Sequence, residues 1–284
     1  MKDYLGAHMS ISGGIHLAPE RGVKAGCGVI QIFTQNANQW RGKEISDADA
    51  LLFREKWAES GLHEVVSHDI YLINLGAPPG EVRDKSLAGF REEMTRCARL
   101  GIGKIVMHPG AHTGDGEETG LKRIAEAFDQ LFAAVPEYTG KVLLETTAGQ
   151  GSNVGYRFEH LQAIISDSSF PDRFGVCLDT CHLFAAGHDL ATPGGQTATW
   201  RAFGRTVGFG RLRLLHLNDS RCVRGSRVDR HALIGRGAIG RAAFGRIVRD
   251  RRLERVPMIL ETPGSLDVWR REIALLRRLA GAHA

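Results

Sequence analysis

Long hydrophobic runs are absent from this sequence of 284 residues. No stretch reaches the roughly 18 consecutive apolar residues of a membrane-spanning helix, and the first ten residues lack the apolar segment of a secretory signal. We therefore expect a cytoplasmic protein with no membrane partner. The hydrophobic content of 43% is nevertheless sufficient for a buried core.

Cysteines are few and odd in number, at positions 27, 97, 177, 181 and 222. They form no compact disulfide framework, which agrees with a reducing compartment. Cys177 and Cys181 lie four residues apart, but no second pair is present to complete a structural zinc site. We interpret Cys177 as a strand residue and Cys181 as a turn residue.

Two further sequence features are also missing. No Gly-x-Gly-x-x-Gly motif with its acidic partner follows an early strand, so a dinucleotide-binding fold has no support. No long linker rich in Pro, Gly or Ser divides the chain, which predicts one domain over residues 1–284. The net charge of +5 is compatible with a polyanionic partner but does not require one.

The sequence does contain a regular alternation of two kinds of segment. Short apolar runs rich in β-branched residues predict strands at Tyr4–Met9, Val29–Thr34, Leu62–His68, Lys104–His108, Lys141–Glu145, Phe174–Asp179, Leu212–Leu217 and Pro257–Glu261. Segments with helical spacing of apolar residues lie between them, at Ser46–Ser60, Glu81–Leu100, Glu117–Val135, Phe158–Ile165, Gln196–Val207, Ala242–Val248 and Leu266–Leu279. Eight buried parallel strands predict an α/β fold, a single-domain (β/α)8 TIM barrel, with a doubly wound open sheet as the alternative.

Residues that commonly ligate metals stand at the carboxyl ends of these strands. The positions are His8, His68, His108, Glu145, Asp179, His216 and Glu261, and His182 follows shortly after the sixth strand. All strand carboxyl ends of a barrel meet at one mouth, where active sites are built. So many buried carboxylates would repel one another unless cations lay among them. The pattern therefore predicts a cluster of metal ions at the C-terminal face of the strands.

A second group of candidate ligands follows the seventh strand. Asp229 and His231 are two residues apart, so in an extended loop they project to the same side, where His182 could join them. A catalytic zinc ion typically takes three protein ligands, so nine candidates suit about three ions. Glu145 is suited to bridge two of them. Histidine-rich ligation favours Zn²⁺, with Mn²⁺ or iron also possible at some sites.

Several motifs give the chain a resemblance to a known family. They are Gly175–Gly187 (GVCLDTCHLFAAG), His216–Ser220 (HLNDS) and Gly225–His231 (GSRVDRH), with weaker matches at Ser67–Gly76, His108–His112 and Glu145–Asn153. With these motifs the chain resembles the endonuclease IV family of apurinic/apyrimidinic (AP) endonucleases over nearly its whole length. The resemblance implies a barrel with three zinc ions in three ligand sets. These sets are His68, His108 and Glu145; then Glu145, Asp179, His216 and Glu261; then His182, Asp229 and His231.

The resemblance also implies an activity, with Glu145 and Glu261 in catalysis. A monomer would hydrolyse the phosphodiester 5′ to abasic sites in duplex DNA, leaving a 3′-hydroxyl and a 5′-deoxyribose phosphate. It would also clean blocked 3′ ends by phosphodiesterase or phosphatase action, as part of base excision repair. The expected DNA contacts are Asn38, Gln39, Trp40, Tyr71, Leu72, Arg227 and Arg230.

Two residues depart from the family pattern. Family members commonly have Asn after the bridging Glu, where this chain has Thr146. They often have Arg in the loop after the second strand, where this chain has Asn38. The second difference bears on how a damaged nucleotide is wedged out of the duplex.

Two other functions are compatible with ligands at strand ends. One is a metal-dependent sugar isomerase or epimerase on a related barrel, which needs one or two ions. The other is a protein that binds damaged DNA without cutting it. The third ligand set, His182, Asp229 and His231, favours the endonuclease over the isomerase.

Overall fold

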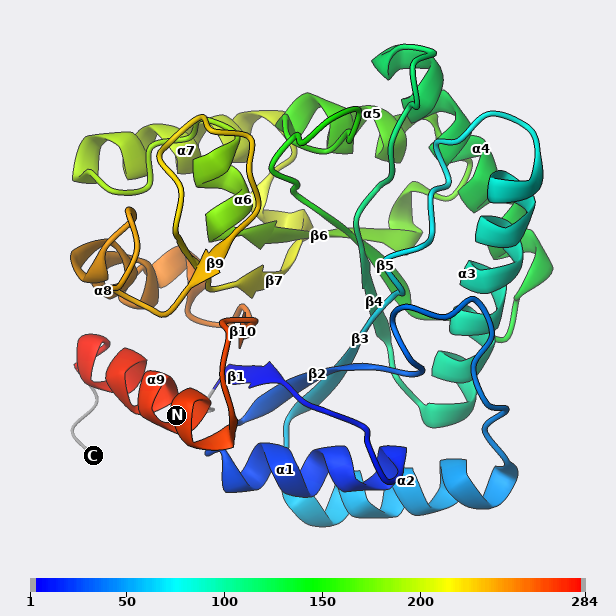
Figure 1. Ribbon diagram of the computed structural model, residues 1–284, viewed down its shortest axis with the longest axis horizontal. Coiled ribbons are helices and arrows are strands. Elements are labelled where there is room, and N and C mark those ends of the chain that lie inside the picture. Colours follow the sequence, from blue (N-terminus) through cyan, green and yellow to red (C-terminus); the bar gives the residue numbers. More distant parts are fainter. Residues whose placement is uncertain (1–3, 282–284) are drawn as a thin grey trace.

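Eight parallel strands close into a barrel in the computed structural model, which describes residues 4–281 (Figure 1). They are β1 (Leu5–His8), β2 (Val29–Phe33), β3 (Glu64–His68), β4 (Lys104–Met107), β5 (Lys141–Glu145), β6 (Phe174–Asp179), β7 (Leu212–His216) and β10 (Met258–Leu260). Their order around the barrel is β1-β10-β7-β6-β5-β4-β3-β2, so β1 closes on the last strand. The predicted TIM barrel is confirmed. The predicted domain limits at residues 1 and 284 lie outside the described residues.

Helices surround the barrel in Figure 1. They are α1 (Ala18–Lys24), α2 (Asp47–Ser60), α3 (Glu81–Leu100), α4 (Glu117–Ala134), α5 (Phe158–Asp167), α6 (Thr180–Ala185), α7 (Pro193–Thr206), α8 (Arg241–Val248) and α9 (Leu266–Leu279). Short 3-10 turns lie at η1 (Ile15–Leu17), η2 (Pro171–Arg173), η3 (Phe209–Arg211) and η4 (Arg251–Leu253). The sequence did not predict α1 or α6, because helices of seven and six residues are too short to show a clear period. Cys181 therefore lies in a helix, not in a turn.

Local sequence signals account for the ends of several elements. Helix α2 begins after Ser46, whose hydroxyl accepts a hydrogen bond from the Asp49 backbone N–H. It ends at Gly61, whose φ of 71° is the left-handed conformation that glycine adopts at low cost. None of the described helices is long and apolar enough to cross a membrane.

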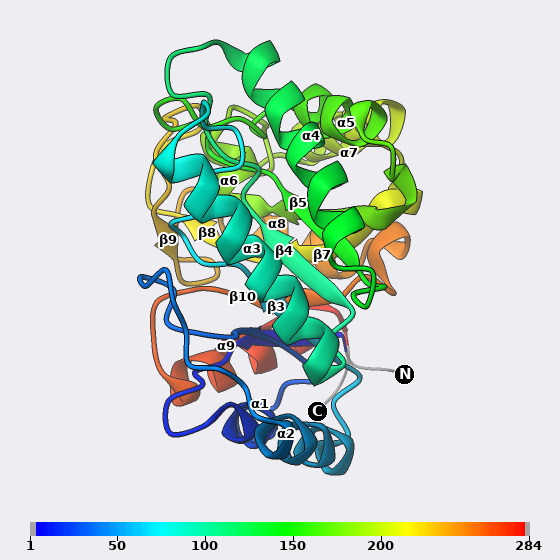
Figure 2. The same cartoon turned by 90° about the vertical axis from the view of Figure 1, so that its right-hand side faces the viewer.

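A small antiparallel pair, β8 (Asp219–Ser220) and β9 (His231–Ala232), lies outside the barrel. Figure 2 shows this pair at the left-hand side of the molecule. The loop between the two strands carries Asp229 and brings His231 back beside Ser220. This pair therefore places the third predicted ligand set close to the carboxyl ends of the barrel strands.

The barrel interior is filled by its own small hydrophobic layer. The layer takes one side chain from each of seven strands: Val29, Val66, Val106, Leu143, Cys177, Leu214 and Ile259. A larger cluster fills the space between the strands and the helices. Side chains two residues apart on a strand point to the same face. Each position two residues beyond this layer therefore faces into the barrel mouth, and most of those positions hold a predicted ligand.

Candidate metal centre

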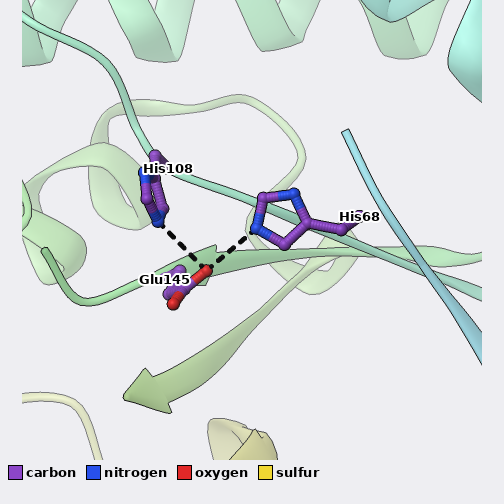
Figure 3. A group of neighbouring side chains, drawn as sticks. All are labelled: His68, His108 and Glu145. Atoms are coloured by element: carbon purple, nitrogen blue, oxygen red, sulfur yellow. Dashed lines mark hydrogen bonds and ion pairs between the residues drawn. The ribbon is translucent and has the colours of Figure 1, made fainter. Parts of the chain in front are cut away.

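Glu145 is the centre of the predicted site. It is the last residue of β5 and its side chain is fully buried. Its Oε2 atom lies 3.2 Å from His68 Nε2 and 3.4 Å from His108 Nε2, and both rings are directed at it in Figure 3. Its Oε1 atom lies 2.9 Å from His216 Nδ1 and 3.2 Å from His182 Nδ1. One carboxylate therefore faces four imidazoles, two at each oxygen.

A second group adjoins the first through Glu145. It joins this carboxylate to Asp179, His216 and Glu261, whose potential ligand atoms all lie within 4.8 Å of one another. His216 Nδ1 is 3.2 Å from Glu261 Oε2 and 3.9 Å from Asp179 Oδ2. Asp179 and His216 are the last residues of the neighbouring strands β6 and β7. Three carboxylates and one imidazole form a donor set that a divalent cation could bind.

The third group lies toward the β8–β9 loop. Asp229 places one carboxylate oxygen 3.1 Å from His182 Nε2 and the other 3.1 Å from His231 Nε2. His182 is buried on α6, whereas the Asp229 side chain is 39% exposed. This group is therefore the most open of the three to solvent. Its loop residues depend on the β8–β9 pair for their position.

The structure thus brings all nine predicted ligands together at the strand ends, in the three sets that the family resemblance implies. That they bind metal ions stays a prediction. Two cysteines also lie within reach of these sets, Cys177 beside Glu145 and Cys181 beside Asp179. Burial raises the pKa of the Cys181 thiol to about 12, and its Sγ atom donates to the Arg230 carbonyl oxygen. Burial also raises the pKa of the Cys177 thiol, so both thiols are protonated side chains next to the site.

The carboxylates and histidines of the site shift one another's pKa values, so that the histidine rings become cationic and Glu145 stays negatively charged. Burial opposes the charged form of His68, but the hydrogen bond and charge of Glu145 outweigh it and raise its pKa to about 10. Burial likewise opposes a charge on His231, but Asp229 raises its pKa to about 9. The neighbouring histidines overcome the effect of burial on Glu145 and hold its pKa well below the usual range. Without a metal ion, protons on the rings balance the carboxylates, and they must leave when a cation binds.

The second ring nitrogen of each histidine, the one that lies away from the histidine's own ligand set, tests whether this donor set suits a metal. In known sites a metal-binding histidine almost always gives its second ring nitrogen to a carboxylate, a carbonyl or water. Here His68 Nδ1 lies 2.8 Å from the Asp69 carbonyl oxygen, and His182 Nδ1 lies 2.8 Å from the Thr146 carbonyl oxygen. His231 Nδ1 lies 3.3 Å from the Glu261 carbonyl oxygen. Backbone carbonyl oxygens therefore orient these rings through their second nitrogens, as they do in known metal sites, so the residues fit a metal centre.

Thr146 and Asn218 support the second group from outside. Thr146 Oγ1 accepts a hydrogen bond of 2.9 Å from the Asp179 backbone N–H. Asn218 Nδ2 donates to Asp179 Oδ2 at 2.6 Å, and its Oδ1 atom accepts from the Glu261 backbone N–H at 2.9 Å. Thr146, which departs from the family pattern, therefore makes a polar contact with the end of β6.

Sequence reasoning missed Gln31, which lies among the ligands. It is fully buried on β2, and its side chain contacts both His216 and Glu261. Glutamine is not a common metal ligand, so its residue type does not mark it as a site residue. The strand period would have found it, because Gln31 lies two residues beyond Val29 of the interior layer.

The predicted DNA contacts after β2 and β3 lie on two neighbouring loops. Asn38 and Gln39 are exposed, whereas Trp40 is partly buried and packs against the core. Tyr71 is 62% exposed, with its ring centroid 6.1 Å from that of His68, and its backbone N–H donates to the Ala37 carbonyl oxygen. Leu72 packs partly against the core. Tyr71 is therefore the exposed aromatic ring nearest the first group.

The predicted phosphate contacts lie on the β8–β9 loop. Arg227 is exposed, and its guanidinium lies over the Tyr156 ring at 4.5 Å from the centroid. Its φ of 54° is the left-handed conformation, which is costly for a residue other than glycine. Arg230 is exposed and donates to the Asp229 carbonyl oxygen. Both arginines therefore stand next to the third group, and their contact with DNA stays a prediction.

Known proteins resemble this chain over nearly its full length. Residues 19–279 match the family model described as xylose isomerase-like TIM barrel. A relative described as "Probable endonuclease 4" from Geotalea daltonii is 67% identical over 93% of this chain and 92% of its own length. Another, from Trichlorobacter lovleyi, is 60% identical over 98% of this chain and 100% of its own. The chain belongs to the endonuclease IV family.

Solved structures agree with this assignment. The crystal structure of endonuclease IV from Thermus thermophilus matches with a TM-score of 0.88 and 34% identity, covering 99% of this chain and 100% of that one. A D-tagatose 3-epimerase-like protein matches with a TM-score of 0.75 but 16% identity. The second likeness is one of fold alone. The epimerase alternative therefore keeps no support beyond the barrel that the two families share.

Proposed function

We propose that this protein is an AP endonuclease of DNA repair that uses a three-ion metal centre. It would hydrolyse the phosphodiester 5′ to an abasic site and leave a 3′-hydroxyl and a 5′-deoxyribose phosphate. The same chemistry would remove blocking groups from 3′ ends. The observation that carries the proposal is the buried Glu145 carboxylate, which faces four histidines at the mouth of a barrel of the endonuclease IV family.

Three zinc ions would occupy the three groups, with Mn²⁺ possible at some of them. The first would be held by His68, His108 and Glu145, the second by Glu145, Asp179, His216 and Glu261, and the third by His182, Asp229 and His231. Bound zinc would polarise the phosphate oxygens and lower the pKa of water toward ~7, which supplies a nucleophile at neutral pH. Glu145 and Glu261 would take part in catalysis because both carboxylates belong to the second group and would hold its ion.

The chain's own residues would bind and orient the DNA around this centre. The His108 side chain is 35% exposed and Asp229 39%, so the mouth opens beside them. Tyr71 and Leu72, with Asn38, Gln39 and Trp40, would contact the duplex where the damaged nucleotide leaves it. An abasic nucleotide is cheap to extrude because it neither pairs nor stacks. Arg227 and Arg230 would contact phosphates. A monomeric state and a cytoplasmic location stay predictions.

The test is cleavage of a duplex that carries one abasic site. We expect the purified protein to cut the abasic strand 5′ to the lesion and to leave an undamaged duplex intact. Chelation should abolish cutting, and added Zn²⁺ should restore it. Binding without cutting by the metal-loaded protein would support the damage-binding alternative. Turnover of a ketose with no action on DNA would support the epimerase.

A further inference from the structure

Gln31 lies between His8 of β1, His216 of β7 and Glu261, which follows β10. Its Nε2 atom donates to Glu261 Oε1 at 2.6 Å and lies 3.0 Å from His8 Nδ1. Its Oε1 atom lies 2.8 Å from His216 Nε2. The side chain has no exposed surface. All of its polar atoms are therefore engaged with residues of the site.

We propose that Gln31 is a positioning residue of the metal centre, which determines the atoms that His216 and Glu261 present to the second ion. This inference rests on the proposed function. It adds to the proposed metal centre a residue that belongs to none of the three ligand sets.

The contacts determine how the amide is oriented. The Glu261 carboxylate can only accept, so the Gln31 NH2 group must face it. The Gln31 carbonyl oxygen then faces His216, and only a ring N–H can donate to it. His216 therefore carries its proton on Nε2. The remaining amide hydrogen faces His8 Nδ1 at 3.0 Å, and this nitrogen accepts it.

This arrangement assigns one atom of each ligand to the ion. The other ring nitrogen, His216 Nδ1, lies 2.9 Å from Glu145 Oε1 and 3.2 Å from Glu261 Oε2, so it is the atom left to the ion once its own proton leaves. Glu261 Oε1 is occupied by the amide, so Oε2 remains available. The same glutamine thus orients a ligand from β7 and a ligand that follows β10, neither of which adjoins β2 in the barrel.

Replacing Gln31 with Met removes the hydrogen bonds to Glu261, His8 and His216 and keeps a side chain of similar length. Loss of an outer partner of a metal ligand typically weakens metal binding about 10–100-fold. We expect the zinc-loaded Gln31→Met protein to lose one of its ions to a competing chelator at about 10–100-fold lower chelator concentration than the wild type. The other two ions should be lost at the same chelator concentrations as in the wild type.

The matched control is Thr34→Val, one residue beyond the same strand. Thr34 is buried and its hydroxyl donates to Glu93, but it contacts no predicted ligand. The Thr34→Val protein should lose its zinc ions at the same chelator concentrations as the wild type, even if its Tm falls. Equal zinc retention in Gln31→Met and the wild type would overturn the proposal, and so would equal loss of the same ion from both variants.

A measurement on the wild type decides the matter even if Gln31→Met does not fold. Nitrogen-15 NMR of zinc-loaded protein labelled at histidine should show His216 protonated on Nε2, with a slowly exchanging proton, and coordinated through Nδ1. Coordination through Nε2 would overturn the proposal while leaving the metal centre intact. A wild-type protein that binds no zinc would instead refute the proposed function.

Discussion

Replacing Glu145 with Gln should lower the rate of abasic-site cleavage by more than about 100-fold, since even the loss of an outer partner of a ligand costs about 10–100-fold in metal affinity or activity. Glutamine keeps the shape of the side chain but not its charge. The neutral amide cannot join two cations, and its NH2 group would face two of the four histidines that now surround the carboxylate. The measurement is the single-turnover cleavage rate at saturating enzyme.

The matched control for this substitution is Glu64→Gln. Glu64 is at the opposite end of β3, where it pairs with Lys104 at 2.8 Å and contacts no predicted ligand. Its cleavage rate should equal that of the wild type. Undiminished cleavage by Glu145→Gln would rule out the central role of this carboxylate.

Replacing Asp219 with Asn should lower the free energy of unfolding by about 3 kcal/mol, the lower end of the contribution of two hydrogen bonds to a charged acceptor at about 1.5–3 kcal/mol each. Asp219 is fully buried. Its Oδ1 atom accepts from the backbone N–H groups of Ser220 and Ile239 at 2.8 and 2.9 Å. Its Oδ2 atom accepts from those of Gly235 and Gly237, both at 3.0 Å. An amide would turn an NH2 group toward one of these pairs of donors.

The measurement for this second substitution is thermal unfolding. We expect the Tm to fall by roughly 6–12 °C, at roughly 2–4 °C per kcal/mol for a domain of this size. The control is Asp267→Asn, because the Asp267 side chain is 70% exposed and its pair with Arg270 should contribute less than about 1 kcal/mol. A Tm of Asp219→Asn equal to that of the control would contradict the predicted anchoring of residues 235–240.

The Asp219 substitution should also disturb the third group. Ser220, next to Asp219, pairs with His231 in the β8–β9 ladder. We therefore expect Asp219→Asn to retain the first two ions better than the third. The effect would reach His231 through the backbone, because Asp219 itself is not a predicted ligand.

The barrel and the nine ligand candidates could be predicted because both depend on local sequence. A buried parallel strand has a continuous apolar run, and a ligand at its end follows that run directly, as His68 and Asp179 do. The barrel geometry then brings the ends together without further information. The short helix α6 was missed because a helix of six residues gives no clear periodicity.

Contacts between distant segments could not be predicted in the same way. Arg227 lies over Tyr156, which is far away in the chain, and no local pattern indicates that pairing. The two-residue strands β8 and β9 are likewise too short to show alternation. The strand period predicts that Gln31 faces the barrel mouth. It does not predict the contacts of Gln31, because its partners His8, Glu261 and His216 come from distant parts of the chain.

The most direct test of the metal centre is anomalous scattering from crystals of the protein purified without added metal. We expect three peaks at the zinc edge, one within each group, with Glu145 between the first two. Such data give the number, the identity and the position of the ions together. Fewer than one tightly bound metal ion per chain, or ions bound away from these residues, would contradict the account.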